Sequence, residues 1–341
     1  AGLIMLTLFF RITGIYPGML MPLLSTVITS IILLVVKFLL ENQQKDFIKN
    51  AFGQYLSSEV IDTILNDPNQ LSLGGEEKEL TAIFTDVKGF STISEQLSPT
   101  KLVLLLNRYL TALSDIILDH QGTIDKFEGD AIIAFFGAPH DLRYHARTAV
   151  LSALQMKKTE TLLNEEFLGG DSPLTPSPLL TRIGVNTGPM VVGNMGTLRK
   201  MDYTIMGNSV NLAARLEGVN KEYNTWILCS HFTYEHIRND VVARALDQVR
   251  VVGINEPVQL YNVLEERAFA SRALMEQIDM FNAAMKLFRE RNWKQAAREL
   301  ERYLEIFQED GTAEVYLGRC RQYMTKPPAD SWDGVYNLTR K

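Results

Sequence analysis

The sequence predicts an α+β protein in which a mixed domain at residues 79–266 lies between two helical ends. Three observations support this fold class. Strand-like and helix-like segments alternate within the mixed region in the order β-α-β-β-α-β, which is typical of a ferredoxin-like core. An uncharged apolar stretch precedes the region at residues 12–36, and an amphipathic helical pattern follows it at residues 276–324.

The bulk composition narrows the class of protein. The chain has 341 residues, which is enough for two or three domains with a sizeable core. Its net charge is −6, so it presents no basic field that would attract nucleic acid, and we expect no nucleic-acid partner. Its two cysteines, Cys229 and Cys320, are too few for a disulfide framework and fit a reducing compartment.

Residues 1–40 are predicted to be transmembrane. No charged residue occurs from Ile12 to Val36, and residues 16–36 would span about 32 Å as a helix, the thickness of the hydrocarbon core of a bilayer. A buried core helix and a signal peptide are the alternatives. No small-residue cleavage site precedes Lys37, which argues against a signal peptide.

Positive charges set the expected orientation of this segment. Lys37, Lys45 and Lys49 follow the apolar stretch, whereas Arg11 alone precedes it. Because positive residues stay on the cytoplasmic side, we expect a chain held in the lipid bilayer of the cell (inner) membrane with its mixed domain in the cytoplasm. Residues 1–10 are apolar and begin without Met, so we also expect a longer natural chain with an N-terminal sensory part.

Residues 41–78 are predicted to form a signalling (coupling) helix followed by a linker. The apolar stripe of this helix needs a partner, which is either the same helix of a second chain or the domain that follows. Residues 68–75 are rich in turn-forming residues, which is typical of a linker. The stripe consists of Phe47, Ala51, Phe52, Tyr55, Leu56, Val60, Ile61, Ile64 and Leu65.

Each element of the mixed domain has its own sequence signal. The first strand, residues 80–85, is apolar and rich in β-forming residues. The helix after it, residues 99–120, repeats leucine at helical spacing. A tight Glu-Gly-Asp turn at residues 128–130 joins two strands as a hairpin. The other predicted elements are the hairpin strands 123–127 and 131–136, a helix at 143–166, strands at 181–186 and 190–194, a helix at 209–219, and strands at 226–230 and 249–252.

Residues 267–341 are predicted to be a small α-helical segment with a tail. Apolar residues at helical spacing, from Phe281 to Leu304, resemble a tetratricopeptide (TPR-like) helix pair. Such repeats normally need three or more copies to be stable, whereas this segment holds about one and a half. A helical cap on the mixed domain is the alternative.

Two carboxylates stand at strand ends, where they can face each other across a gap. Asp86 follows the first strand in FTDVKGFS, and Asp130 lies in the hairpin of DKFEGDAIIAFFG. Hard divalent cations such as Mg²⁺ take a few carboxylate ligands and complete their shell with substrate phosphates. Backbone N–H groups around Gly89 and Phe90 can form an anion site at a helix start. A metal–nucleotide site is one hypothesis, and two solvated turn residues are the alternative.

A third stretch, DYTIMGNSVNLAARLEG, places polar residues on a helix. Asn211 and Arg215 are four residues apart and share one helix face. An arginine next to a polyphosphate can neutralise the charge that develops during phosphoryl transfer.

With these motifs, residues 45–265 resemble the class III nucleotide cyclases, among them the bacterial membrane-anchored receptor-type cyclases. The resemblance rests on the Asp and Gly-Phe turn of FTDVKGFS, on KFEGD, and on the helix that carries the Asn and Arg. It implies that Asp86 and Asp130, helped by the carbonyl of Val87, hold two Mg²⁺ ions per site, which Mn²⁺ can replace.

The resemblance also implies how the substrate is bound. Arg182, in TRIGVNTG, would contact the terminal phosphates, and Gly89 and Phe90 would form the turn beside the substrate. Asn211 would orient the ribose, and Arg215 would stabilise the transition state.

Two further positions would read the base. Lys126 only donates hydrogen bonds and suits N1 of adenine. The partner position lies seven residues before Asn211 and holds Thr204, whose hydroxyl can accept from N6 but can also donate. The pair resembles the Lys/Thr subgroup of adenylate cyclases and favours ATP over GTP.

The implied reaction is the conversion of ATP to 3′,5′-cyclic AMP and pyrophosphate by a two-metal mechanism. In the family, Asn211 and Arg215 would come from the second subunit. The expected assembly is therefore a head-to-tail homodimer whose sites are shared between chains.

Departures from the family pattern keep alternatives open. Relatives carry a lysine where Val252 stands, with Arg250 as a possible replacement, and Asn208 stands where an Asp is usual. The alternatives are a catalytically weak or dead cyclase-like domain that acts as a signalling scaffold, and a guanylate cyclase. A diguanylate cyclase-like enzyme is disfavoured, because FEGDA replaces the Gly-Gly-Glu-Glu-Phe signature at the hairpin.

Overall fold

The chain forms two units that are described separately. A computed structural model describes residues 2–14, 17–52, 73–169, 173–197, 199–250, 257–329, 332 and 334–337. The first unit covers Ala1–Leu71 and the second covers Ser72–Lys341.

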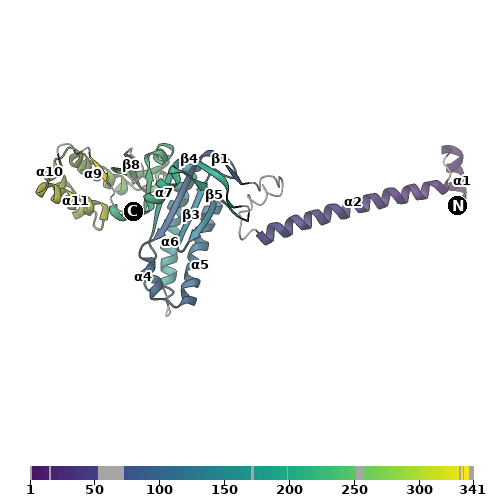
Figure 1. Cartoon of the computed structure of the whole chain (residues 1–341), viewed down its shortest axis with the longest axis horizontal. Coiled ribbons are helices and arrows are strands. Elements are labelled where there is room, and N and C mark those ends of the chain that lie inside the picture. The colour runs from purple at the N-terminus through teal and green to yellow at the C-terminus, as the bar shows by residue number, and fades with distance from the viewer. Residues whose placement is uncertain are drawn as a thin grey trace. The chain divides into compact units, whose positions relative to one another are not determined.

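The described part of the first unit consists of the helices α1 (Gly2–Thr13) and α2 (Pro17–Phe52) (Figure 1). Gly14, with a φ of 67°, ends α1 inside the uncharged stretch 12–36, so that stretch is not one continuous helix. No helix in the described ranges combines the length and the apolar character needed to cross a membrane, so the predicted span is not supported. The expected cytoplasmic location of the second unit stays a prediction.

The predicted coupling stripe cannot be followed through its length. The α2 backbone continues to Phe52, but the stripe side chains at 47–52 and the whole of residues 53–72 lie outside the described part of the chain. Earlier in α2, the large apolar side chains between Leu24 and Leu40 are exposed. The structure therefore leaves the choice between a second chain and the following domain as a prediction.

A mixed sheet forms the centre of the second unit, in the order β2-β3-β1-β4-β6-β8-β7-β9, with β5 paired to β4. Its β1 and β4 are antiparallel over fourteen residue pairs, from Gly74 opposite Asn194 to Val87 opposite Thr181. This long pairing explains two differences from the sequence prediction: the linker ends before Gly74, and the two strands predicted around residue 188 form one. The strands are β1 (Gly74–Val87), β2 (Thr123–Glu128), β3 (Ala131–Phe136), β4 (Thr181–Thr197), β5 (Lys200–Met206), β6 (Ile227–Ser230), β7 (Val241–Arg250), β8 (Val258–Glu266) and β9 (Val335–Asn337).

Helices cover both faces of the sheet. One face carries Ile83 and Val87 of β1 and packs against α5 and α6, and the other carries Leu80 and Ala82 and packs against α7 and β5 (Figure 1). Side chains alternate between the faces of a strand, so Asp86 lies on the α7 side. The helices of this part are α4 (Phe90–Glu95), α5 (Pro99–Asp119), α6 (His145–Leu168), α7 (Asn208–Tyr223) and α8 (His231–Ile237), with a 3-10 turn at Arg267–Phe269.

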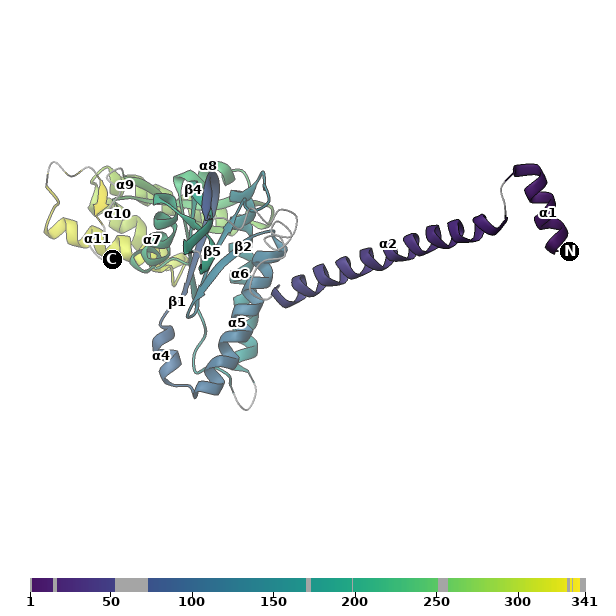
Figure 2. The same cartoon turned by 45° about the vertical axis from the view of Figure 1, so that its right-hand side comes forward.

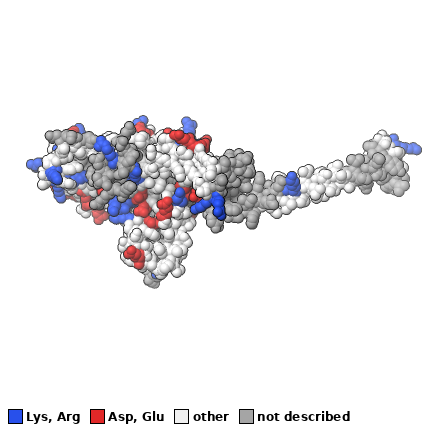
Figure 3. Space-filling model, viewed as in Figure 1, with Lys and Arg blue, Asp and Glu red and all other residues white. Residues whose placement is uncertain are grey.

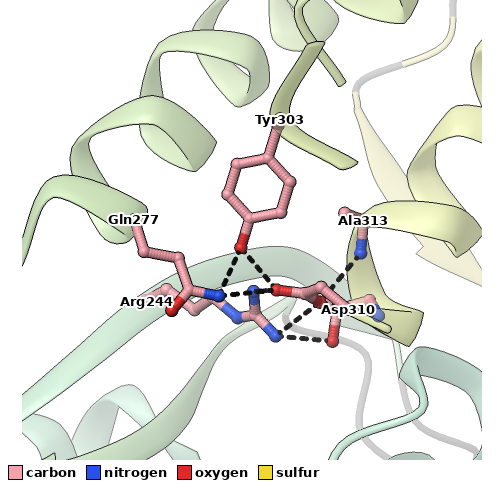
Figure 4. A network of polar contacts seen from close by, with 6 residues as sticks. Arg244, Gln277, Tyr303, Asp310 and Ala313 are labelled. Atoms are coloured by element: carbon pink, nitrogen blue, oxygen red, sulfur yellow. Dashed lines mark hydrogen bonds and ion pairs between the residues drawn. The ribbon is translucent and has the colours of Figure 1, made fainter. Parts of the chain in front are cut away.

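The C-terminal helices α9 (Arg272–Arg289), α10 (Trp293–Ile306) and α11 (Gly311–Thr325) share a core with the sheet and α7. Figure 2 shows α11 beside α7, and the two helices are in contact. Buried ion pairs reinforce this junction: Arg244 of β7 bonds Asp310 at 2.6 Å, and Tyr303 donates to the same carboxylate at 2.5 Å (Figure 4). These contacts favour the helical cap over an independent repeat domain.

Acidic and basic side chains are interspersed on the face of the second unit that Figure 3 presents. No continuous basic stripe crosses that visible face in the described part of the chain. This distribution agrees with the net charge of −6, and the expectation of no nucleic-acid partner stays a prediction.

Candidate active site

The two predicted metal carboxylates converge at the end of β1. Asp130, in the turn between β2 and β3, accepts a hydrogen bond at 2.9 Å from the backbone N–H of Val87, the residue after Asp86. Burial raises the pKa of Asp86, the charge of Asp130 raises it further, and Arg182 opposes the rise. Burial also raises the pKa of Asp130, against the hydrogen bond from Val87. Burial therefore disfavours the ionised form of each carboxylate, and a cation bound nearby would offset this effect.

This donor set fits a hard divalent cation. Two half-buried carboxylates lie at the end of β1. Among the residues that the structure describes, no larger cluster of His, Cys, Asp or Glu side chains is suited to a metal. Magnesium is commonly held in this way, by one or two carboxylates with the remaining ligands supplied by phosphates and water. The role of the Val87 carbonyl stays a prediction.

The turn after Asp86 depends on one glycine. Gly89 has a φ of 71° and immediately precedes α4, in a left-handed conformation that favours glycine. The N–H of Lys88 donates to the carbonyl of Leu180 at 2.9 Å, so it is not available to a ligand. The predicted anion site therefore consists only of the first N–H groups of α4, which include that of Phe90.

Arg182 lies beside the carboxylates. It is directly opposite Asp86 in the antiparallel register of β1 and β4, so the two side chains share a face of the sheet. Its charge lowers the pKa of Asp86. The structure therefore places a cation at the expected phosphate end of the site.

Lys126 and Thr204, the predicted base readers, meet through a residue that the sequence analysis did not select. The Thr204 hydroxyl donates to Asp125 Oδ2 at 2.7 Å, and Lys126 Nζ lies 3.4 Å from Asp125 Oδ1. A β-bulge between Ile124 and Lys126 sits at Asp125 and explains how two consecutive side chains reach the same place. Strand alternation alone would have placed Asp125 on the opposite face from Lys126, so the sequence held no signal for this contact.

The helix α7 carries Asn211, which is exposed, and Arg215, which is partly exposed. Two residues later, Glu217 faces the carboxylates of its own chain. Burial raises the pKa of Glu217 to about 7, with a further contribution from Asp86. At about 100° per residue, Arg215 lies about 200° around the helix from Glu217. Arg215 therefore lies on a different side of α7 from Glu217.

Two parts of the predicted site come together within this chain. Asp86, Asp130 and Arg182 form the first part, and Lys126 and Thr204 form the second. Asn211 and Arg215 form a third part, on α7. Val252 lies outside the described residues, and Arg250 is the last residue of β7.

Comparisons with known proteins agree with this geometry. The adenylate and guanylate cyclase catalytic domain family matches residues 75–265. Adenylate cyclase 1 of Rhizobium meliloti (strain 1021) is 32% identical over 214 residues, which are 63% of this chain and 32% of that protein. The terminal-differentiation specific adenylate cyclase of Dictyostelium discoideum is 32% identical over 249 residues, 72% of this chain and 11% of that protein. The chain thus spans about a third or less of the length of these relatives.

Solved structures of both nucleotide specificities resemble the chain. The adenylyl cyclase CyaB from P. aeruginosa is 38% identical with a TM-score of 0.53, over 58% of this chain and 100% of that one. The guanylyl cyclase Cya2 is 33% identical with a TM-score of 0.51, over 57% of this chain and 95% of that one. The matched region holds every predicted site residue from Asp86 to Arg215. The chain belongs to the family of class III adenylate and guanylate cyclase catalytic domains.

Proposed function

We propose that this chain is an adenylate cyclase that converts ATP to 3′,5′-cyclic AMP and pyrophosphate in a homodimer. The convergence of Asp86 and Asp130 at one strand end carries the proposal. Their pKa values are raised by burial, and the charge of Asp130 adds to the rise at Asp86, as expected of a site built to hold cations.

Asp86 and Asp130 would hold two Mg²⁺ ions per site, with the Val87 carbonyl as a further ligand and Mn²⁺ as an alternative metal. Bound there, the metal would lower the pKa of the ribose 3′-hydroxyl and neutralise charge on the triphosphate. Arg182, on the same face of the sheet, would contact the terminal phosphates, and the turn at Gly89 and Phe90 would lie beside them.

Lys126 and Thr204 would recognise the base. Lys126 offers only donors, which match N1 of adenine and oppose the N1–H of guanine. Thr204 supplies an oxygen that can accept from the N6 amino group. This pair supports ATP over GTP and the Lys/Thr subgroup of adenylate cyclases.

Asn211 and Arg215 would reach the substrate from a second copy of the chain, in a head-to-tail arrangement. The observation in favour is that Glu217 of the same helix lies near enough to Asp86 and Asp130 to respond to their charges, whereas Arg215 lies on a different side of the helix. A symmetric pair of chains would then contain two composite sites. Asn211 would orient the ribose, and Arg215 would stabilise charge on the reacting phosphate.

A second candidate, guanylate cyclase activity, has support from the likeness to the guanylyl cyclase Cya2. The test is to incubate the whole chain with ATP or GTP, with Mg²⁺ or Mn²⁺, and to quantify both cyclic nucleotides. We expect cyclic AMP as the main product, and none above background with Asp86→Ala. Cyclic GMP in excess of cyclic AMP would favour the second candidate. If neither nucleotide gives a cyclic product, the alternative of a catalytically dead domain that acts as a signalling scaffold would be favoured.

A further inference from the structure

The bulge on β2 buries a carboxylate beside the base-reading residues. The side chain of Asp125 is only 3% exposed, although Lys126 next to it is 42% exposed. Its Oδ2 accepts a hydrogen bond from the Thr204 hydroxyl of β5 at 2.7 Å. Its Oδ1 lies 3.4 Å from Lys126 Nζ and accepts no hydrogen bond within the described part of the chain. One buried carboxylate therefore contacts both residues that are expected to read the base.

This contact restricts what the Thr204 hydroxyl can offer a ligand. A hydroxyl has one proton and two acceptor lone pairs, whereas an ionised carboxylate only accepts. The single proton of Thr204 is therefore used by Asp125. Towards the nucleotide, the Thr204 oxygen can only accept.

We propose that Asp125 is a specificity-determining positioning residue, which fixes the Thr204 hydroxyl as an acceptor and thereby selects adenine over guanine. The proposal rests on the proposed adenylate cyclase function and adds to it a residue outside the expected base pair. Asp125 acts through Thr204 and does not itself touch the base.

The edges of the two purines explain the selection. Adenine presents the N6 amino donor where guanine presents the O6 acceptor. An acceptor-only Thr204 pairs with N6 and meets O6 with an oxygen of the same polarity. A free hydroxyl would turn its proton towards O6 and tolerate guanine. Polar groups left unpaired in a site are what make hydrogen-bond selection strong.

Two neighbours of Asp125 favour its ionised form, against the effect of burial. Burial raises its pKa, while the hydrogen bond from Thr204 and the charge of Lys126 act in the opposite direction. Thr204 and Lys126 thus favour the ionised form, which is the form that holds the proton of Thr204.

The test is the substitution Asp125→Asn, which keeps the shape of the side chain. An amide can donate to Thr204 as well as accept from it, so the hydroxyl becomes free to turn. The ratio of kcat/KM for ATP to that for GTP should fall by about tenfold, the size of one hydrogen-bond preference. Asp125→Ala, which removes the acceptor altogether, should lower the ratio in the same direction.

Two further variants separate the hydrogen bond from other effects. Asp202→Asn removes a nearby negative charge that raises the pKa of Asp125, but it leaves the bond to Thr204 intact, so the ATP/GTP ratio should not change. In a Thr204→Val background there is no hydroxyl to orient. Asp125→Asn should then produce no further change in the ratio, which makes the two effects non-additive.

A purely structural role for Asp125 predicts a different result, because turnover of both nucleotides would fall together at a constant ratio. That result would overturn the proposal. Dissociation constants for ATP and GTP, measured by calorimetry on the same variants, give the selectivity of binding without turnover. If the unsubstituted chain prefers ATP in binding but forms no cyclic AMP, and Asp125→Asn reduces that preference, the proposed function fails and the role of Asp125 stands. If the chain forms cyclic AMP and Asp125→Asn keeps its selectivity, only the role of Asp125 fails.

Discussion

Arg215 and Glu217 lie on opposite sides of one helix, α7, separated by about 200° around its axis. Glu217 is close enough to Asp86 and Asp130 for their charges to raise its pKa. Arg215 therefore lies on a different side of α7 from the residue that interacts with the carboxylates. This separation is the reason for proposing that Arg215 reaches the carboxylates of a second chain.

Removing either predicted metal-binding carboxylate should lower the activity without lowering the stability. We expect Asp86→Asn and Asp130→Asn each to lower cyclic AMP formation by at least about a hundredfold, the usual effect of losing an essential charge at a reacting phosphate. The melting temperature of the metal-free protein should stay the same or rise, because each substitution removes a buried charge whose pKa is raised.

Asp141→Asn is the matched control for this pair. Asp141 is exposed and pairs with Lys78 on the surface, so its loss should change neither activity nor melting temperature by a measurable amount. Normal turnover by Asp86→Asn with Mg²⁺ would show that the carboxylates do not hold an essential metal.

Glu217 should make the stability of the metal-free protein depend on pH. Its folded pKa, about 7, lies above the ordinary value of 4.5, so the folded state binds the proton more tightly than the unfolded state. The resulting stabilisation is complete below about pH 4.5 and is lost as the pH rises through about 7. Relative to Glu217→Gln, the natural protein should therefore lose melting temperature between pH 5 and pH 8, by at least about 2 °C.

The measurement is a series of melting curves with EDTA from pH 5 to pH 8.5. Added Mg²⁺ should reduce the difference between the two proteins, because a cation beside Asp86 offsets the charge that disfavours ionised Glu217. Parallel curves over the whole pH range would mean that folding does not raise the pKa of Glu217.

The sequence predicted the parts of the fold that depend on local patterns. The helices near residues 99–120, 143–166 and 209–219 and the hairpin at residues 128–130 were predicted because apolar spacing and turn residues mark them. The sequence analysis predicted two strands in place of β4, because Gly and Pro near residue 188 suggest a turn. The pairing of β4 with the whole of β1 is a long-range effect that local patterns do not show. The helix α8 and the strands β5, β8 and β9 were also missed.

In the candidate site, too, residues in local motifs were predicted and residues placed by long-range packing were not. Asp86, Asp130 and Arg182 were selected because each lies in a short motif, and the structure brings them together, while their roles stay predictions. Asp125 and Glu217 were missed for a different reason. The place of Asp125 depends on a bulge, and that of Glu217 depends on how α7 packs across the sheet, neither of which has a signature in the neighbouring residues.

The C-terminal helices should contribute to the stability of the cyclase fold. Arg319 of α11 bonds Asp247 of β7 at 2.5 Å, where Asp247 is buried and the side chain of Arg319 is 10% exposed. Tyr223 of α7 and Tyr316 of α11 donate to the same carboxylate. Arg319→Ala leaves a buried charge without its counter-ion and should lower the free energy of unfolding by roughly 3–5 kcal/mol.

Arg321→Ala on the same helix is the control, because its pair with Glu301 is exposed and should contribute at most about 1 kcal/mol. Denaturant titration of both variants measures the difference. Equal effects would mean that the junction between α11 and the sheet does not depend on this ion pair.

Complementation between two inactive variants should reveal whether the site is shared. Asp86→Ala removes a metal ligand, and Arg215→Ala removes the group expected from the other chain, so each should be inactive as a homodimer. Random pairing makes about half of all dimers mixed, and a mixed dimer has one intact site out of two. Co-expressed variants should therefore recover about a quarter of the natural activity, as a symmetric two-fold assembly requires.

The two variants need different affinity tags, so that mixed dimers can be isolated and assayed apart from the homodimers. Asp86→Ala with Asp130→Ala is the matched control, because both lesions fall in the same half of the site. Its mixed dimers should have no intact site and stay inactive. If the Asp86→Ala and Arg215→Ala mixed dimers are equally inactive, each site lies within one chain, and the position of Arg215 on α7 has another purpose.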